Sequence, residues 1–251
     1  MSHGELQESE YRFPYHWIPE AERSWSSTRR LEWGLEYLGT LHAVLDAVVP
    51  LRPTRVLDFG CGDGRLACEL SDAGVPNVVG VDLSASAIAF ATAFAHRCEN
   101  PPVFHAVAVA ELDPRVFDVC VAMEVLEHIS DADIEDVVLQ IHRRLAEDGR
   151  FIVTVPSTRR PVHEKHYRHY DIELLCSQLA PYFALEDVRY VHRVGRTATA
   201  LRRLAHNRLF DASNEHVLRW VTGRYKRSVQ YATRSTGAHL LATFRREGGS
   251  T

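Results

Sequence analysis

The sequence predicts an α/β fold in which one doubly wound sheet of seven strands is covered by helices. Two observations support this prediction. Short apolar runs alternate with longer segments whose apolar residues recur at helical spacing. Glycine or acidic residues follow the first two apolar runs, as they do at the ligand-binding edge of parallel sheets. Strands that alternate with helices in this way favour parallel strand–helix–strand units.

Length and composition limit the class of protein. A chain of 251 residues with 45% hydrophobic and 25% charged residues fits one soluble globular domain with an added subdomain. It contains no apolar run of about 18 residues, and its first residues lack the order of a signal peptide. We therefore expect a cytoplasmic protein without a membrane partner. The five cysteines form no CxxC pair, which predicts reduced, mostly buried thiols.

The expected elements follow one another in a simple order. Residues 1–50 form an aromatic-rich N-terminal arm and a helix over 28–49, which together we expect to act as a lid, and residues 51–251 form the main domain. Strands are expected at 55–59, 78–82, 103–107, 117–123, 151–155, 183–194 and 238–246. Helices are expected at 65–73, 85–96, 131–147 and 171–180, with a helical insertion at about 197–235 before the last strand.

A glycine-rich turn, DFGCGDG, connects the first strand of the sheet to the helix after it. Gly60 and Gly62 let the backbone turn tightly and approach a ligand closely. Asp82 ends the next strand, where a carboxylate accepts both hydroxyls of a ribose. The turn lacks the GxGxxG spacing, and Asp58 suits a cationic amino-acid group better than a pyrophosphate. These residues predict an adenosine-like ligand, although on their own they leave a dinucleotide open.

The motifs resemble, in order and spacing, those of class I S-adenosylmethionine-dependent methyltransferases. The matching segments are LDFGCGDG, VVGVDLS, FDVCVAMEVLEHI and LAEDGRFIVTVP, and the resemblance covers roughly residues 40–195. It implies a Rossmann-like fold, a methyltransferase domain within 51–251 and the cofactor S-adenosyl-L-methionine. The positions that it implies for the cofactor are Asp58, Gly60 and Gly62 at the methionine part, Asp82 at the ribose, Leu83 at the adenine and Met123 beside the sulfonium.

Two further features concern the same cofactor. Many members of the family carry an Asp after the third strand, whereas this chain reads HAVAVAELD there. We therefore expect backbone groups and apolar contacts from residues 107–110 to hold the adenine. In the N-terminal arm, Tyr15, His16 and Trp17 would fold over the cofactor as a lid or pack on the first helix.

A second group of polar residues follows the fourth strand. Because residues three apart share one face of a helical turn, Glu124 and Glu127 should lie together beside His128. The loop after the fifth strand carries His166 and His169 and should overhang the same crevice. Carboxylates and imidazoles from all five residues would form a divalent-metal site, and oxygen donors suit Mg²⁺ or Mn²⁺ better than zinc. A bound metal would chelate two neighbouring hydroxyls and lower the pKa of one.

This second group leaves the chemistry open. Glu-x-x-Glu-His with a later His is similar to the metal-dependent small-RNA 3′-terminal ribose methyltransferases. The segment EVLEH also occurs in methyltransferases that use no metal, such as those of quinone synthesis. Acid–base catalysis by His128 or His169 without a metal and a purely structural role are therefore alternatives. The candidate catalytic residues are Glu124, Glu127, His128 and His169.

The expected reaction is O-methylation of a sugar or another small polyhydroxylated metabolite. The Glu/His group, the aromatic arm and the lack of a recognisable RNA-binding module support this expectation. An RNA ribose 2′-O-methyltransferase and a metal-free small-molecule O- or N-methyltransferase are the alternatives. A cofactor-binding protein without catalysis is disfavoured, because the cofactor motif and the charged crevice are both intact.

Charge is distributed unevenly along the chain. Residues 188–251 carry thirteen Lys and Arg but three Asp and Glu, although the whole chain has a net charge of -4. A basic face of this kind attracts an anionic partner, such as a nucleic acid or a phosphate on the substrate. It can equally be a solvated helix face or the contact of a homodimer. The insertion at 197–235 is the segment that we expect to set acceptor choice or build a dimer.

Overall fold

Eight strands join in one mixed sheet, in the order β3-β2-β1-β4-β5-β8-β6-β7. The structure is a computed structural model that describes residues 31–112, 116–205 and 215–248. Strands β1 to β5 are parallel to one another, whereas β8 lies antiparallel between β5 and β6. The strands are β1 (Arg55–Phe59), β2 (Asn77–Val81), β3 (Val103–His105), β4 (Phe117–Met123), β5 (Leu145–Pro156), β6 (Phe183–Arg193), β7 (Tyr231–Ala232) and β8 (Gly237–Arg246). The helices are α2 (Leu31–Val48), α3 (Arg65–Asp72), α4 (Ala85–Ala95), α5 (Ile134–Arg144), α6 (Ile172–Leu179), α7 (Arg196–Ala205) and α8 (Glu215–Ser228).

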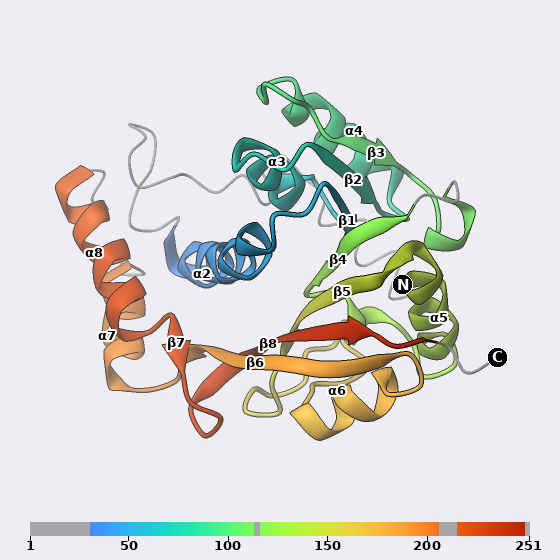
Figure 1. Cartoon of the computed structure of the whole chain (residues 1–251). Coiled ribbons are helices and arrows are strands. Elements are labelled where there is room, and N and C mark those ends of the chain that lie inside the picture. The colour runs from blue at the N-terminus through green and yellow to red at the C-terminus, as the bar shows by residue number, and fades with distance from the viewer. Residues whose placement is uncertain (1–30, 113–115, 206–214, 249–251) are drawn as a thin grey trace.

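Helices cover both faces of the sheet (Figure 1). On one face, α2 and α3 contribute Leu41, Val44 and Leu70 to a buried apolar cluster. On the other face, α5 and α6 contribute Val138 and Leu175 to a second cluster. The prediction of a doubly wound α/β sheet is therefore confirmed.

Neighbouring residues of the central strands enter opposite cores. Val56 of β1 packs in the cluster of α2 and α3, whereas Leu57 packs in that of α5 and α6. Val121 and Cys120 of β4 divide in the same way. Because successive side chains of a strand point to opposite faces, a strand covered on both faces needs an apolar residue at every position. This is why the sequence shows short unbroken apolar runs.

Two details differ from the sequence-based prediction. The sheet has eight strands instead of seven, because β7 is two residues long and so short a segment shows no periodicity. The fifth strand begins at Leu145, within the expected helix, and includes the expected turn at Asp148 and Gly149. The pairing of β4 with β5 shifts in register there, which accommodates the turn within the strand.

The helical insertion packs on α2. It comprises α7 and α8, while residues 206–214 lie outside the described parts of the chain. Leu35 of α2 joins Leu201 of α7 with Val221 and Tyr225 of α8 in an apolar cluster of their own. Because β5, β6 and β8 pair near Pro156, Arg193 and Gly237, α7 begins at the edge of the sheet where β5 ends. The insertion therefore stands on the carboxyl side of the parallel strands, at the left of Figure 1.

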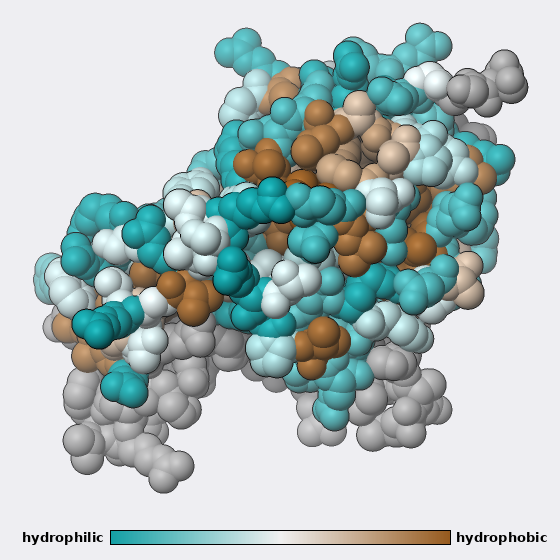
Figure 2. Space-filling view, turned by 90° about the horizontal axis from the view of Figure 1, so that it is seen from below, coloured by the Kyte–Doolittle hydropathy of each residue, from teal (hydrophilic) through white to brown (hydrophobic). Residues whose placement is uncertain are grey.

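The N-terminal arm, including Tyr15, lies outside the described residues, so its expected lid role stays a prediction. The helix that follows it, α2, shares a core with β1 and α3. None of the helices that the structure describes combines the length and the apolar character needed to cross a membrane. Seen from below, hydrophilic side chains cover most of the surface, and hydrophobic ones gather around a hollow in the upper half of the view (Figure 2).

Candidate active site

The glycine-rich turn between β1 and α3 lines a cleft at the carboxyl edge of the sheet. Gly60 and Gly62 have φ angles of 71° and 53°, in the left-handed region that glycine adopts without strain. A Cβ atom on Gly60 would lie 2.6 Å from Cγ2 of Val125, so no side chain fits there. The amides of Gly60 and Cys61 donate to the carbonyl of Val81 at 2.8 and 3.0 Å. These bonds hold the turn against the end of β2.

Asp82 is fixed in this cleft by backbone amides on both sides. Its Oδ2 accepts from the amide of Gly62 and its Oδ1 from that of Ser84, each at 2.9 Å. The hydroxyl of Ser84 in turn accepts from the amide of Ala87 and caps α4. These bonds hold the carboxylate of Asp82 in the lining of the cleft, at the end of β2.

Asp58 lies at the cleft with one unsatisfied oxygen. Its side chain is 2% exposed, and Oδ2 has no hydrogen-bond partner among the described residues. Burial raises the pKa of Asp58 to about 7, and the nearby charge of Asp82 adds to the effect. Leaving a buried carboxylate oxygen without a partner is unfavourable, so the site favours a ligand that brings a cation.

The cleft is a single cavity of about 740 Å³, a size suited to a small-molecule ligand. Its lining includes every candidate cofactor residue that the structure describes: Asp58, Gly60, Gly62, Asp82, Leu83 and Met123. Residues 107–110, expected at the adenine, line it as well. Leu83 is 81% exposed, which leaves an apolar surface for a flat ring to cover.

Other residues of the cleft were missed from the sequence. Tyr37 of α2 lines the cavity, but it stands beside Leu38 in the apolar stripe of the helix and so resembles a core residue. The connection from β4 to α5 and the start of that helix also contribute Ser130, Asp133, Asp136 and Gln140. Their positions depend on how α5 packs against the sheet, which no local pattern indicates.

Three candidate metal ligands converge where β4 ends. Glu127, His128 and His166 each place a ligand atom within 4.8 Å of the others. Glu127 and His128 come from a short 3-10 turn after β4, and His166 comes from the loop after β5. The amide of Tyr167 donates to the carbonyl of Glu127 at 2.8 Å and holds the loop against that turn. His128 lines the cleft, so this cluster borders the cofactor cavity.

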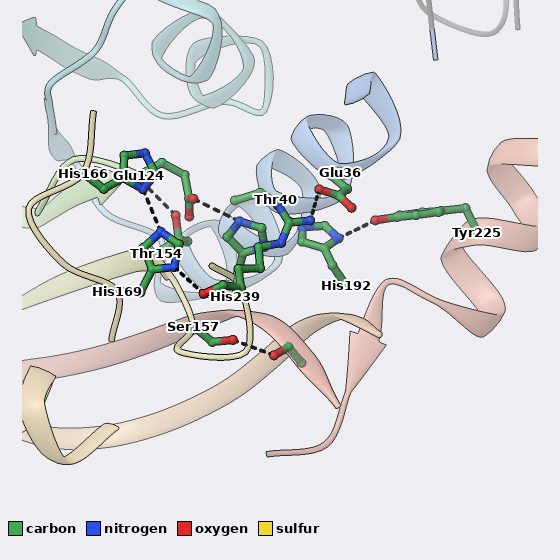
Figure 3. Close-up of polar contacts among 12 residues, drawn as sticks. Glu36, Thr40, Glu124, Thr154, Ser157, His166, His169, His192, Tyr225 and His239 are labelled. Atoms are coloured by element: carbon green, nitrogen blue, oxygen red, sulfur yellow. Dashed lines mark hydrogen bonds and ion pairs between the residues drawn. The ribbon is translucent and has the colours of Figure 1, made fainter. Parts of the chain in front are cut away.

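Hydrogen bonds determine where the ring protons of this cluster and of the neighbouring His169 lie, and Figure 3 shows those of His166 and His169. The carbonyl of Arg160 can only accept, so His169 donates to it through Nδ1, at 3.1 Å. Burial lowers the pKa of His169 and lowers that of His166 to about 4, so both rings are neutral at pH 7. Nε2 of His169 then accepts from Nδ1 of His166 at 2.9 Å, which leaves the lone pair of His166 on Nε2. His128 contacts the carbonyl of Lys165 through Nδ1 at 3.1 Å, so in its neutral form the lone pair is also on Nε2.

Glu124 and His169 lie beside the three-residue cluster. Both ring nitrogens of His169 are hydrogen-bonded, one to His166 and one to the carbonyl of Arg160. His169 therefore supports His166 and has no ring nitrogen left for a metal. The expectation that one helical turn carries Glu124 and Glu127 is wrong. The amide of Glu124 bonds to the carbonyl and the hydroxyl of Thr154, at 3.0 and 3.1 Å, and its φ of 58° excludes it from the helical turn. Its Oε2 instead lies 3.2 Å from Nε2 of His239 on β8.

The two glutamates have opposite ionisation tendencies. Burial would raise the pKa of Glu124, but His239 beside it outweighs this effect and keeps that pKa below its ordinary value. Burial raises the pKa of Glu127 well above its ordinary value, and the charge of Glu124 adds to the rise. Glu127 Oε2 and Glu124 Oε1 are both buried without a hydrogen-bond partner in the described part of the chain. The pair is therefore suited to a cation, whose charge would favour ionisation of Glu127.

A family model described as a methyltransferase domain matches residues 31–222 of this chain. The chain belongs to this methyltransferase family. Its match includes α2, the whole cleft, the insertion helix α7 and the first part of α8. With the fold and this match together, the chain is an S-adenosylmethionine-dependent methyltransferase.

Known methyltransferases are similar to the chain in part or in fold. A ubiquinone biosynthesis O-methyltransferase of Rhodopseudomonas palustris is 44% identical over 78 residues, which are 31% of this chain and 30% of that protein. The chain thus spans about a third of the length of that curated relative. The N-methyltransferase NodS of Bradyrhizobium japonicum, solved with S-adenosyl-L-homocysteine, superposes with a TM-score of 0.60 at 17% identity, over 99% of this chain and 100% of its own. Magnesium protoporphyrin IX methyltransferase of Synechocystis, with bound S-adenosylmethionine, gives a TM-score of 0.56 at 17% identity, over 98% of each chain. The last two likenesses show the fold.

Proposed function

We propose that the cleft binds S-adenosyl-L-methionine with its ammonium group at Asp58, its ribose at Asp82 and its adenine at Leu83. The unpartnered oxygen of Asp58 supports the first contact, because an ammonium group would supply the missing donor. The anchored carboxylate of Asp82 supports the second contact, and the exposed apolar surface of Leu83 supports the third. The bound cofactor would supply a methyl group on a sulfonium, beside Met123 and Glu124 at the end of β4.

Cofactor affinity is expected to depend on pH around neutrality. The pKa of Asp58 is about 7 without ligand, and an ammonium group beside it would lower that pKa in the complex. Above pH 7 the carboxylate is already ionised, so affinity should level off. Below pH 7 binding must release a proton, so affinity should fall by up to about tenfold per pH unit. Calorimetric titration of S-adenosyl-L-homocysteine from about pH 5 to about pH 9 measures this dependence.

The control for the pH dependence is Asp58→Asn, which keeps the side-chain shape and removes the titrating group. It should bind more weakly than the wild type and lose most of the dependence. An affinity of the wild type that stays constant over the whole range would contradict the assignment of Asp58.

We propose further that the methyl acceptor is a hydroxyl of a sugar or another small polyhydroxylated metabolite, with a divalent metal held by Glu127, His128 and His166. The observation that carries this proposal is the convergence of the three ligand atoms at the border of the cleft. The tautomer of His166 supplies a nitrogen lone pair, and the unpartnered oxygen of Glu127 supplies an oxygen donor once the charge of the metal ionises that carboxyl group. The name of the curated relative, an O-methyltransferase, supports oxygen as the acceptor atom.

The donor set also suggests which metal suits the site. The sequence led us to expect Mg²⁺ or Mn²⁺, because two carboxylates were to ligate it. Among the described residues one carboxylate converges with the two imidazoles, and imidazole suits a transition metal better than Mg²⁺. Of the two metals expected from the sequence, we therefore propose that Mn²⁺ suits the site better than Mg²⁺. A metal there would chelate neighbouring oxygens of the acceptor and lower the pKa of the reacting hydroxyl.

Glu124 has a separate role in this proposal. It is the ionised member of the glutamate pair, it lines the cleft, and its Oε1 lacks a partner among the residues described. An acceptor hydroxyl would donate to that oxygen and so be oriented toward the methyl group. Orientation of this kind contributes directly to the rate, because methyl transfer needs the oxygen, carbon and sulfur in line.

The charges of the cleft disfavour the RNA alternative. Its acidic lining residues are Asp58, Asp82, Glu124, Asp133 and Asp136, and within the described ranges no Lys or Arg joins them. A polyanion such as RNA is recognised through Lys and Arg that neutralise its phosphates. A neutral polyol carries no charge, so its binding requires no Lys or Arg.

An assay with defined acceptors tests this proposal. Purified protein, stripped of metal by EDTA, is given S-adenosylmethionine with catechol, methyl glucoside or a short single-stranded RNA. We expect a small diol to be methylated, little turnover in EDTA, and more recovery with Mn²⁺ than with Mg²⁺. Equal turnover with and without EDTA would contradict the proposed role of the metal and favour a metal-free methyltransferase. Turnover with the RNA alone would favour the ribose methyltransferase.

A further inference from the structure

A row of four polar side chains connects the cleft to the helical insertion. We call Glu124, His239, His192 and Tyr225 the polar row (Figure 3). Glu124 of the cleft pairs with His239 of β8 at 3.2 Å. The ring of His239 packs edge-on against that of His192 on β6, with 5.0 Å between the centroids. Nδ1 of His192 is hydrogen-bonded to the hydroxyl of Tyr225 on α8.

Three of the four side chains in the row are buried, although apolar residues could fill the same space. His239, His192 and Tyr225 are each less than a tenth exposed. Burying polar groups is unfavourable unless hydrogen bonds compensate. His192 is satisfied on both sides, because its Nε2 also bonds to the hydroxyl of Thr40 on α2 at 2.7 Å. Three separate elements, α2, α8 and β8, thus place polar side chains around the ring of His192.

Two backbone features are shaped around His192. Its φ of 60° lies in the left-handed region, which a residue with a side chain adopts only when its surroundings hold it there. Gly39 lies in the middle of α2, where a Cβ atom would sit 2.9 Å from Cε1 of His192 and 3.0 Å from Cε1 of Tyr225. A helix-interior glycine is otherwise unfavourable, so the packing here depends on leaving room for these two rings.

His239 has few other constraints on its orientation. Its Nδ1 is buried without a hydrogen-bond partner in the described chain, so its hydrogen bonding is to Glu124. The ring of His192 packs on it in a T-shaped arrangement. A displacement of His192 would therefore be passed to His239, and from there to the carboxylate of Glu124. The backbone of Glu124, by contrast, is held independently by Thr154.

We propose that His239 is a positioning residue for Glu124, and that the polar row makes the position of this carboxylate depend on the docking of α8. The proposal rests on the proposed function, in which Glu124 orients the acceptor hydroxyl. The insertion stands at the edge of the sheet where β5 ends, on the same side as the cleft. A shift of α8 would therefore reach the reacting groups through His192 without any contact with the cofactor.

Four variants test the row. His239→Leu removes the partner of Glu124, and His239→Gln restores an N–H donor at that place. Tyr225→Phe removes the hydroxyl at the far end of the row. Tyr231→Phe is its matched control, because it also removes a tyrosine hydroxyl, one that donates to Asp46 of α2 outside the row.

The first measurement is steady-state turnover with catechol as the acceptor probe. His239→Leu should lower kcat by about tenfold or more with KM for catechol and affinity for S-adenosyl-L-homocysteine nearly unchanged, because a misplaced carboxylate affects the transition state. His239→Gln should recover part of that loss. Tyr225→Phe should lower kcat by a few-fold, and Tyr231→Phe should leave it unchanged. A kcat of His239→Leu equal to that of the wild type would overturn the positioning role.

The second measurement needs no acceptor and so separates this proposal from the proposed function. Histidine ring signals are followed by NMR, and the signal of His239 is identified by its loss in His239→Gln. Tyr225→Phe should move the signals of both His192 and His239, whereas Tyr231→Phe should move neither. A change in the signals of His192 alone would contradict the proposed coupling between His192 and His239. If the wild type methylates none of the probes, the proposed function fails while this measurement still decides whether the row is coupled.

Discussion

Glu127→Gln is expected to abolish most turnover while the cofactor still binds. Glutamine matches glutamate in shape, so the buried site should keep its packing. It cannot ionise, so the cluster with His128 and His166 would lose its anionic donor. We expect kcat to fall by a factor of about 100 or more, as when a group acting on the reacting proton is removed. Steady-state turnover with Mn²⁺ and catechol measures the loss, and calorimetry with S-adenosyl-L-homocysteine measures cofactor binding.

The matched control for this variant is Glu135→Gln on the exposed surface of α5. It should retain wild-type turnover. Binding of Mn²⁺, followed by its electron paramagnetic resonance signal, should weaken in Glu127→Gln only. If Glu127→Gln kept both turnover and Mn²⁺ binding, the cluster would have no role in the reaction.

Asp82→Ala is expected to weaken cofactor binding directly. The carboxylate would lose its hydrogen bonds to two ribose hydroxyls, and bonds to a charged group contribute about 1.5–3 kcal/mol each. The same change frees the amides of Gly62 and Ser84, which now hold the turn and the start of α4 in place. Calorimetric titration of S-adenosyl-L-homocysteine should therefore show a loss of about 100-fold or more in affinity.

Two comparisons make the result of Asp82→Ala interpretable. Asp148→Ala changes an exposed acid away from the cleft and should bind the cofactor normally. Asp82→Asn keeps an oxygen for one hydroxyl and should lie between Asp82→Ala and the wild type. Thermal unfolding without ligand shows whether either variant has lost its fold. Unchanged affinity in a folded Asp82→Ala protein would mean that the end of β2 does not hold the ribose.

The positions of site residues that depend on local sequence could be predicted. The turn around Gly60 and Gly62 and the acid at Asp82 lie at the ends of strands, and a strand, a tight turn and a helix each leave a local pattern. Their shared cavity then follows from the rule that parallel strands end at one edge. Glu127, His128 and His166 were predicted as one group for the same reason, because β4 and β5 are neighbours.

The polar row could not be predicted, because its contacts join distant parts of the chain. His192 of the row, for example, bonds to Thr40, which lies 152 residues away in the sequence. His239 lies in a strand that looks like any apolar strand, and its contact with Glu124 requires β8 to pair with β5. No local sequence pattern predicts the pairing of β8 with β5. The left-handed backbone of Glu124 was missed likewise, since it depends on the hydroxyl of Thr154 across the sheet.

The place of β8 between β5 and β6 has a consequence for how the protein is made on the ribosome. Synthesis is vectorial, so N-terminal segments leave the ribosome first, whereas a domain generally folds as a unit. The strands that carry the cofactor cleft, β1, β2 and β4, are complete long before Gly237 is synthesised. Until then β5 and β6 each present an unpaired edge, and unpaired edges invite aggregation. The segments that line the cofactor cleft are thus synthesised early and the strand that completes the sheet is synthesised late, and that late strand carries His239, the partner of Glu124.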